Sequence, residues 1–255
     1  MKRPARFTIS SADFDGTVAL VGGPELHHMR DVMRLAPGAR VELLDESGAQ
    51  YAGIIRQFEV RRAVVEIAGR NSPSPPAAGE LMLAAAVIKG GRMDYLVEKA
   101  VELGAAEIWP LIAARGAVRD VGAERLARWR RLANAAAKQS FAPRSPVISG
   151  PISLQDLIRR TTVGRLGFVL SAGAPPLAGL VRDARAHAFV IVCGPEGDFT
   201  PAEAAALRTA GFLSAGLGPQ RLRSETAALA ALSIAAGAID ELHGGPRRTA
   251  EKVEP

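Results

Sequence analysis

The sequence has one cysteine, few aromatic residues and no long apolar run, and each shortage excludes a class of protein. A lone Cys193 cannot form an internal disulfide, so the fold does not rest on a disulfide framework and the chain fits a reducing compartment. No apolar stretch approaches the roughly 20 residues that a membrane helix needs, and the opening residues MKRPARFTIS lack the apolar segment of a secretion signal. Aromatic residues make up only 5% of the chain, which argues against a stacking platform for single-stranded nucleic acid. We expect a cytoplasmic protein without membrane contact, and a buried Cys193 rather than a reactive thiol.

Common nucleotide, metal and nucleophile motifs are absent as well. The sequence contains neither the phosphate-binding pattern GxxxxGK[ST] nor a dinucleotide fingerprint GxGxxG after its first strand. Its four histidines are an adjacent pair, His27 and His28, and two isolated residues, so none offers metal-ligand spacing and we expect no metal. There is no GxSxG nucleophile elbow. A ligand site must therefore be built mainly from backbone amides and carbonyls, which suits a neutral heterocycle such as adenine.

Positive charge is concentrated in one segment. The whole chain carries 32 basic and 26 acidic residues, a formal net charge of +6. Residues 115–144 contain eight basic and two acidic residues, so this segment alone nets +6 and the remainder is close to neutral. A concentrated basic patch indicates an anionic partner, with nucleic acid as the leading candidate and a solvated arginine-rich helix as the alternative.

Composition divides the chain into two domains. Residues 1–72 contain short alternating or β-branched runs separated by glycine turns, which predict the strands of a small β-barrel. One helical insert has apolar residues at helical spacing, Leu26, Met29, Val32 and Met33. The proline-rich segment 73–79 predicts a linker, and the polar tail 244–255 is expected to be disordered.

Residues 80–243 alternate apolar strand runs with helices. Strands are predicted at 81–88, 106–112, 166–172, 188–194 and 212–218, and helices at 93–103 and 124–140. The first of these helices is followed by Gly104, a plausible C-cap. This alternation implies a parallel sheet covered on both faces, and in such sheets ligands bind beyond the carboxyl ends of the strands.

Two glycine-containing loops follow predicted strands in this second domain. In the first loop, Gly194 and Gly197 allow a sharp turn and a close approach to a ligand, and TPAE at 200–203 is a capping-box signature. In the second loop, residues 216–224, two glycines precede Ser224, the expected helix cap. A single loop of this kind is most often a plain connection, but two on successive strands predict a shared, backbone-lined pocket.

The helix that follows the second loop is made almost entirely of small residues. Seven of residues 225–240 are alanine, and there is one glycine, at position 237. Small side chains allow backbones to approach where leucines would not fit, so the composition favours close packing against other segments. The alternative is simply the high helix propensity of alanine.

The two loops also carry a family resemblance. CGPEGDFT at 193–200, followed by LGPQRLRSETAAL at 217–229, resembles the paired signature of the SPOUT methyltransferases. More narrowly, it is similar to the bacterial 16S ribosomal RNA uridine N3-methyltransferase family. RPARF at 3–7, HHMRDVMRLAPGARVELLDESGAQYAGII at 27–55 and KGGRMDYLVEKAVELGAAEIWPL at 89–111 resemble that family in the same order. The similarity covers most of residues 3–240.

The resemblance implies an α/β fold in two domains. The C-terminal SPOUT domain would have a parallel sheet and a deep trefoil knot, and the N-terminal domain would be a PUA-like β-barrel that binds RNA. The knot loops would bind S-adenosylmethionine, and a homodimer would methylate N3 of a uridine in the 16S ribosomal RNA of the small subunit. Two alternatives stay open: a SPOUT ribose 2′-O-methyltransferase acting on transfer or ribosomal RNA, and a noncatalytic RNA-binding assembly protein.

The resemblance also implies roles for individual residues. Arg223 would hold the target nucleotide or stabilise charge on the uracil carbonyl, the alternative being a structural salt bridge to Glu225 or Glu196. Glu225 would orient that arginine or serve as the base. The implied cofactor-binding residues are Leu170, Gly194, Pro195, Glu196, Gly197, Leu217, Gly218, Leu222 and Thr226. The expected RNA contacts are Arg6, Arg30, Arg34, Arg125, Arg128, Arg131, Arg144 and Arg221.

Four positions depart from the family's usual residues. Asp198 stands where glycine is usual, and Gln220 where arginine is usual. Lys138 replaces a glutamate, and Ala142 replaces an arginine. We expect these departures to affect how the RNA substrate is bound rather than the cofactor pocket. Arg221 and Arg144 are the candidates to supply the missing charge.

Overall fold

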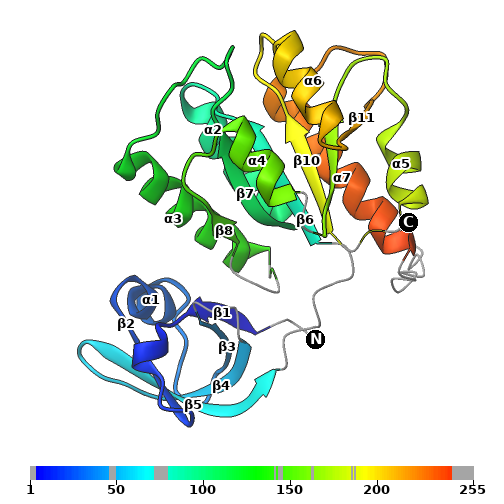
Figure 1. The fold of residues 1–255 in the computed structure, drawn as a ribbon. Helices are drawn as coiled ribbons and strands as arrows, with labels where there is room; N and C mark the ends of the chain where they lie inside the picture. Colours follow the sequence, from blue (N-terminus) through cyan, green and yellow to red (C-terminus); the bar gives the residue numbers. More distant parts are fainter. Residues whose placement is uncertain are drawn as a thin grey trace, which may run out of the picture. The chain divides into compact units, whose positions relative to one another are not determined.

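A computed structural model provides the fold (Figure 1). It describes residues 4–45, 50–71, 80–140, 142, 146–161, 164–184, 186 and 188–242. The predicted linker at 73–79, the predicted tail at 244–255 and Arg144 lie outside the described residues. Contacts divide the chain into two units, residues 1–76 with 131–146 and residues 77–130 with 147–255.

The first unit is built on a curled five-stranded sheet. Its strands are β1 (Ala5–Thr8), β2 (Val18–Gly22), β3 (Arg40–Leu44), β4 (Gln50–Phe58) and β5 (Arg62–Asn71). They pair in the order β1-β3-β4-β5-β2, with β1 parallel to β3 and the other pairs antiparallel. The inward side chains form one apolar cluster that includes Phe7, Val41, Ile55 and Val65. A PUA-like barrel stays a prediction for this unit.

The predicted helical insert is present but does not keep one regular turn. It consists of α1 (Gly23–His27) followed by a π-helical turn at His28–Val32, where the amide of Met33 donates to the carbonyl of His28 at 2.9 Å. Leu26 and Met29 are buried in the apolar cluster, whereas Val32 is 61% and Met33 43% exposed. The wider π turn changes the angular spacing, so the four apolar residues do not form one buried face.

Lys138, one of the four departures from the family pattern, contacts Glu25 within the first unit. Helix α3 (Ala123–Gln139) spans both units, and its last part, from Arg131 onward, belongs to the first. The Lys138 ammonium pairs with Oε1 of Glu25, which also accepts a 3.0 Å hydrogen bond from the hydroxyl of Thr8. Burial lowers the pKa of Lys138. Because the other oxygen of Glu25 is buried without a hydrogen-bond partner among the described residues, the lysine supplies the countercharge that this carboxylate needs.

The second unit is a six-stranded sheet in which every strand pair is parallel, as the sequence predicted. Its strands are β6 (Glu80–Ala86), β7 (Ala105–Leu111), β8 (Val147–Ile148), β9 (Leu166–Leu170), β10 (Ala188–Cys193) and β11 (Leu213–Ala215). They lie in the order β11-β9-β10-β6-β7-β8. The central strands are almost entirely apolar because helices cover both faces.

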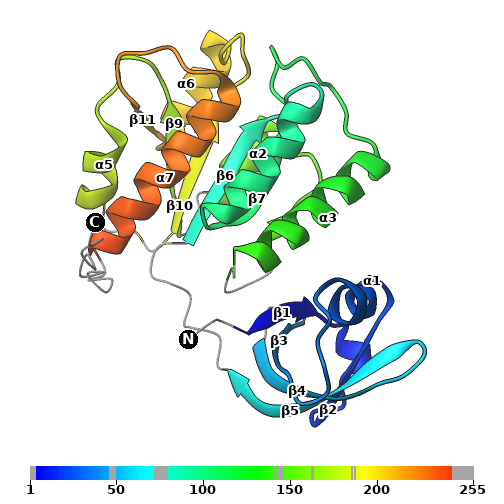
Figure 2. The same ribbon diagram turned by 180° about the vertical axis from the view of Figure 1, so that it is seen from behind.

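Helices α4 (Leu154–Thr161) and α6 (Pro201–Thr209) cover one face of the parallel sheet (Figure 1). On the other face lie α2 (Gly91–Glu102) and α7 (Ser224–Leu242), which pack against each other. Figure 2 shows both helices in front of the strands. Helix α5 (Leu177–Asp183) packs against α7. The left-handed Gly104, with φ 91°, follows α2 as predicted. The predicted capping box also begins α6, where Thr200 and Glu203 each accept a hydrogen bond from the other's amide.

The small residues of α7 serve close packing along only part of the helix. Ala228, Ala231 and Ala235 are fully buried. Gly237, by contrast, is exposed, and apart from its own helix backbone no atom of the described residues lies within 4 Å of an added Cβ, so close packing does not require a glycine there. The trefoil knot that the resemblance implies stays a prediction.

Candidate functional site

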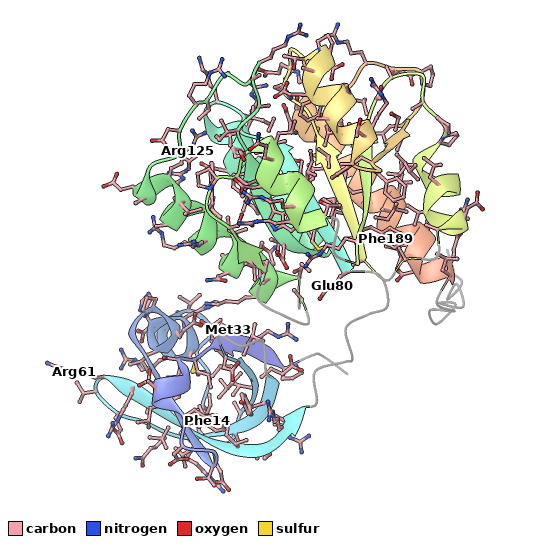
Figure 3. The ribbon with its side chains drawn as sticks, viewed as in Figure 1. Phe14, Met33, Arg61, Glu80, Arg125 and Phe189 are labelled. Atoms are coloured by element: carbon pink, nitrogen blue, oxygen red, sulfur yellow. The ribbon has the colours of Figure 1, made fainter. Side chains whose placement is uncertain are left out.

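A cavity of about 460 Å³ lies at the carboxyl ends of β9, β10 and β11. Three loops border it, one after each of these strands: Ser171 and Ala172, most of residues 194–198, and most of residues 217–223. Because the three strands are parallel, their carboxyl ends meet at one edge of the sheet (Figure 1). Figure 3 labels Glu80 and Phe189 near the beginnings of β6 and β10, at the opposite end of the sheet.

Most of the predicted cofactor-binding residues border this cavity. They are Leu170, Gly194, Pro195, Glu196, Leu217, Gly218 and Leu222. Two others do not: Gly197 faces Arg115, whose guanidinium donates to its carbonyl at 3.2 Å, and Thr226 is exposed on α7. Sequence reasoning missed Ser171 and Ala172, because the loop after β9 carries no glycine pattern of the kind that marked the other two. That the bordering residues contact a cofactor stays a prediction.

Backbone contacts explain the glycine at the start of the second loop. A Cβ on Gly216 would lie 2.3 Å from the carbonyl oxygen of Ala174. The two segments are hydrogen-bonded there, with the amide of Gly216 donating to Pro175 at 2.7 Å and the amide of Leu177 donating to Gly216 at 3.0 Å. Gly218 has a φ of 120°, which side chains rarely allow. The sequence at 216–218 therefore shapes one wall of the cavity through its backbone.

Arg223 borders the cavity with a free guanidinium. It is exposed and, among the described residues, makes no ion pair. The alternative considered for it, a salt bridge to Glu196 or Glu225, is absent because both carboxylates pair with Arg92 instead. Arg221, expected to contact RNA, also borders the cavity. Two arginines therefore border the cavity, together with the carboxylates of Glu196 and Asp198 and a set of backbone and apolar groups.

Arg92, which sequence reasoning did not single out, joins the two predicted loops. Its guanidinium Nη1 lies 2.6 Å from Oε1 of Glu196 in the first loop and 3.7 Å from Oε2 of Glu225 just after the second. Glu225, a predicted catalytic residue, is 8% exposed and does not border the cavity. The three residues lie far apart in the sequence, and only the folded sheet brings them together.

Asp198 borders the cavity in a strained backbone conformation. Its φ is 59°, in the left-handed region that suits the glycine usual at this position. The carboxylate Oδ1 accepts a 2.7 Å hydrogen bond from the amide of Phe199, and this local bond helps to hold the turn. The aspartate thus adds a negative group to the cavity wall.

Cys193, at the end of β10, is a buried thiol at the base of the cavity. Its Sγ donates to the carbonyl of Ser224 at 3.3 Å. Burial first, then the nearby carboxylates of Glu225 and Asp198, raise the pKa of this thiol to about 12. The thiolate is therefore not populated near neutral pH, in line with the prediction of a buried, unreactive cysteine.

The expected RNA-contacting arginines differ in how much surface they offer. Arg6 is 6% exposed by side chain, paired with Glu42 and hydrogen-bonded to the carbonyl of Ala142 at 2.5 Å. Arg125, labelled in Figure 3, donates to the carbonyl of Ile88 and lies over the ring of Trp129. These two arginines support the fold.

The remaining arginines of this set are more exposed. Arg128 is 61% exposed and pairs with Asp94, and Arg30 is 43% exposed and pairs with Asp31. Arg131 and Arg34 are exposed as well, and Arg34 has a left-handed φ of 51°. These residues keep the capacity to contact phosphates.

No group of three or more His, Cys, Asp or Glu side chains in the described ranges is arranged to hold a metal ion. Within the same ranges, every helix is too short or too polar to cross a membrane.

The chain is similar to proteins named as RNA methyltransferases. Residues 75–236 match the model of the RNA methyltransferase domain family. The chain is 33% identical to a protein named ribosomal RNA small subunit methyltransferase E from Mycobacterium bovis, covering 89% of this chain and 88% of the relative. It is 28% identical to the protein of that name from Bacillus subtilis, over 88% and 91% of the two chains.

Solved structures resemble it as well. The ribosomal RNA small subunit methyltransferase E from Neisseria gonorrhoeae, solved with bound S-adenosyl methionine, has a TM-score of 0.78 and 29% identity over 94% of this chain and 98% of its own. A putative methyltransferase from Legionella pneumophila, solved with the same cofactor, has a TM-score of 0.79 and 26% identity over 93% and 98%.

Proposed function

The chain belongs to the RNA methyltransferase domain family, among the ribosomal RNA small subunit methyltransferases E, and on that premise we propose that it transfers a methyl group from S-adenosylmethionine to N3 of a uridine in the 16S ribosomal RNA of the small subunit. The observation that carries this proposal is the single cavity bordered by the loops after β9, β10 and β11. Relatives with 26% and 29% identity were solved with this cofactor bound.

The cavity suits S-adenosylmethionine in size and chemistry. Its volume of about 460 Å³ falls within the range usual for cofactor pockets. Glycine backbone at 194 and 218 can approach a flat heterocycle closely, and the apolar Leu217 and Leu222 can cover its faces. The carboxylates of Glu196 and Asp198 add negative charge to a wall that would hold a cationic ligand. We propose that these residues bind the cofactor.

When bound, S-adenosylmethionine supplies a methyl group already activated by its sulfonium, so the protein has mainly to position the acceptor. Loss of the proton from uracil N3 to solvent water leaves negative charge on the ring carbonyls. Arg223, which borders the cavity and makes no ion pair among the described residues, is placed to donate hydrogen bonds to such an oxygen. Holding the nitrogen in line with the methyl group then supplies much of the acceleration.

Glu225 supports the site rather than taking the proton. Its carboxylate is buried, paired with Arg92 and outside the cavity lining. A general base must reach the proton that it removes within about 3 Å or through one water. We therefore assign catalysis to Arg223 and a supporting role to Glu225.

The exposed arginines of both units would hold the RNA through its phosphates. Arg128 and Arg131 on α3, with Arg30 and Arg34 in the first unit, are the proposed contacts, and Arg221 would act at the cavity itself. Phosphate contacts give salt-dependent affinity with little sequence information. We also retain the homodimer as a proposal, which sedimentation at several concentrations tests.

The proposed function is tested by incubation with methyl-labelled S-adenosylmethionine and either small ribosomal subunits or naked 16S ribosomal RNA, followed by nucleoside mass spectrometry. The proposal predicts labelled 3-methyluridine at one position. Labelled 2′-O-methyluridine would make the protein a ribose methyltransferase, and RNA binding without saturable cofactor binding would make it a noncatalytic assembly protein.

The role of Arg223 needs its own variant. Arg223→Ala should lower methyl transfer by about 100-fold while leaving cofactor affinity unchanged. Arg208→Ala, which removes an exposed arginine of α6 away from the cavity, is the control. Loss of cofactor binding together with activity in Arg223→Ala would refute a substrate role and favour a structural one.

A further inference from the structure

Arg92 bridges the two main loops of the cavity from outside its lining. It is the second residue of α2, and one nitrogen of its guanidinium serves both carboxylates, Glu196 at 2.6 Å and Glu225 at 3.7 Å. Glu196 belongs to the loop after β10 and borders the cavity, whereas Glu225 follows the loop after β11 at the start of α7. These two ion pairs are called the Arg92 bridge below.

Glu225 depends on this bridge electrostatically. Its side chain is 10% exposed, and its Oε2 has no hydrogen-bond partner among the described residues. A buried carboxylate without a nearby cation is costly. Arg92 is the one cation within ion-pair distance of Glu225 in the described part of the chain. Removal of Arg92 would therefore leave an uncompensated charge directly beside the second loop.

The position of Arg92 is not explained by the stability of α2. A cation in the first turn of a helix lies at the positive end of the helix dipole, where it is unfavourable by itself. Gly90, with a left-handed φ of 69°, sets the direction in which the helix begins. The interactions that stabilise Arg92 at this position lie outside the helix, in its ion pairs with Glu196 and Glu225.

We propose that Arg92 is a positioning residue, which holds the loops at 194–198 and 217–223 in the arrangement that binds S-adenosylmethionine. This inference rests on the proposed function. The pair with Glu196 fixes the edge of the first loop, and the pair with Glu225 fixes the point where the second loop enters α7. Arg92 itself does not line the cavity.

The test compares Arg92→Ala, Arg92→Lys and a matched control, Arg182→Ala. Arg182 pairs with Glu241 at 2.8 Å, so the control removes an ion pair to the same helix α7 at its far end from the cavity. Two measurements are made on each protein: hydrogen exchange of residues 194–200 and 216–224 without ligand, and calorimetric titration with S-adenosylmethionine. Thermal unfolding of each variant reports whether the fold is kept.

The bridge predicts a specific pattern across the three variants. In Arg92→Ala both loops exchange faster than in the wild type, and the Kd for S-adenosylmethionine rises roughly 3- to 30-fold, the range of long-range coupling effects. Arg92→Lys recovers part of the affinity, because an ammonium can pair with one carboxylate at a time. Arg182→Ala leaves both the exchange of the loops and the Kd unchanged.

A double variant separates positioning from general stability. In a Glu225→Gln background the buried charge is gone, so adding Arg92→Ala should raise the Kd less than it does in the wild type. Unchanged loop exchange and an unchanged Kd in Arg92→Ala would overturn the proposal, as would equal effects in Arg182→Ala. If the wild type binds no S-adenosylmethionine, the proposed function fails, and the exchange rates alone decide whether the bridge orders the loops.

Discussion

Replacing Gly216 with alanine should destabilise the protein by forcing apart two hydrogen-bonded backbone segments. The added Cβ would lie 2.3 Å from the carbonyl oxygen and 3.1 Å from the carbonyl carbon of Ala174. Both are backbone atoms, so no side-chain rotation relieves the clash. The same crossing carries the hydrogen bonds from Gly216 to Pro175 and from Leu177 to Gly216.

The magnitude follows from these contacts. Overpacking costs about 1–3 kcal/mol and a lost backbone hydrogen bond about 0.5–1.5 kcal/mol, so the free energy of unfolding should fall by roughly 2–4 kcal/mol. In a domain of this size, 1 kcal/mol corresponds to about 2–4 °C in Tm, which predicts a drop of roughly 5–15 °C. Urea unfolding followed by circular dichroism, with calorimetry for the Tm, measures both quantities.

The matched control is Gly237→Ala. This glycine lies within α7 with open space around it, and alanine is the better helix former, so the variant should be more stable by about 0.5–1 kcal/mol. Glycine-to-alanine substitution is therefore expected to lower the free energy of unfolding at position 216 and to raise it at position 237. A Gly216→Ala protein as stable as the wild type would refute the backbone crossing at 174–177.

Three further predictions concern single side chains. Asp198→Ala should lower the free energy of unfolding by about 1–2 kcal/mol, because alanine would have to adopt the left-handed φ without the hydrogen bond from the amide of Phe199. Asp198→Gly should stay within about 0.5 kcal/mol of the wild type, because glycine adopts this φ without strain. Denaturant unfolding measures both. Lys138→Glu should lower stability by about 1–3 kcal/mol by placing a second carboxylate against Glu25, and the double variant with Glu25→Gln should regain part of the loss. Since burial raises the pKa of the Cys193 thiol from 9.0 to about 12, its contribution to stability is complete below pH 9 and is lost as pH rises toward 12. Cys193→Ala should flatten the alkaline limb of stability against pH, and an unchanged slope would contradict this assignment.

Periodicity and local turn chemistry were enough to predict five of the six strands of the second unit, but not β8, α4 or α5. The strand runs, the αL glycine after α2 and the capping box of α6 depend on neighbouring residues, and all three are confirmed. The meeting of the loops after β10 and β11 also followed, because parallel strands place their carboxyl ends at one edge.

The rest depended on contacts between distant residues, which a single sequence does not display. In the sequence, nothing distinguishes Arg92 from other helix residues, and only the folded structure places it within ion-pair distance of Glu196 and Glu225. Arg6 reads as a basic surface residue, yet it is buried in a pair with Glu42. The π turn after α1 likewise depends on tertiary packing, and it exposes apolar residues that helical spacing would have grouped together.

We propose that the loops after β9, β10 and β11 form one binding site for the methyl donor. A crystal structure of the protein grown with saturating S-adenosylhomocysteine tests it most directly. Ligand density is expected between residues 194–198 and 217–223, with the Arg92 bridge intact beside it. Density at another place on the protein, or well-ordered loops with side chains filling the space between them and no ligand, would contradict it.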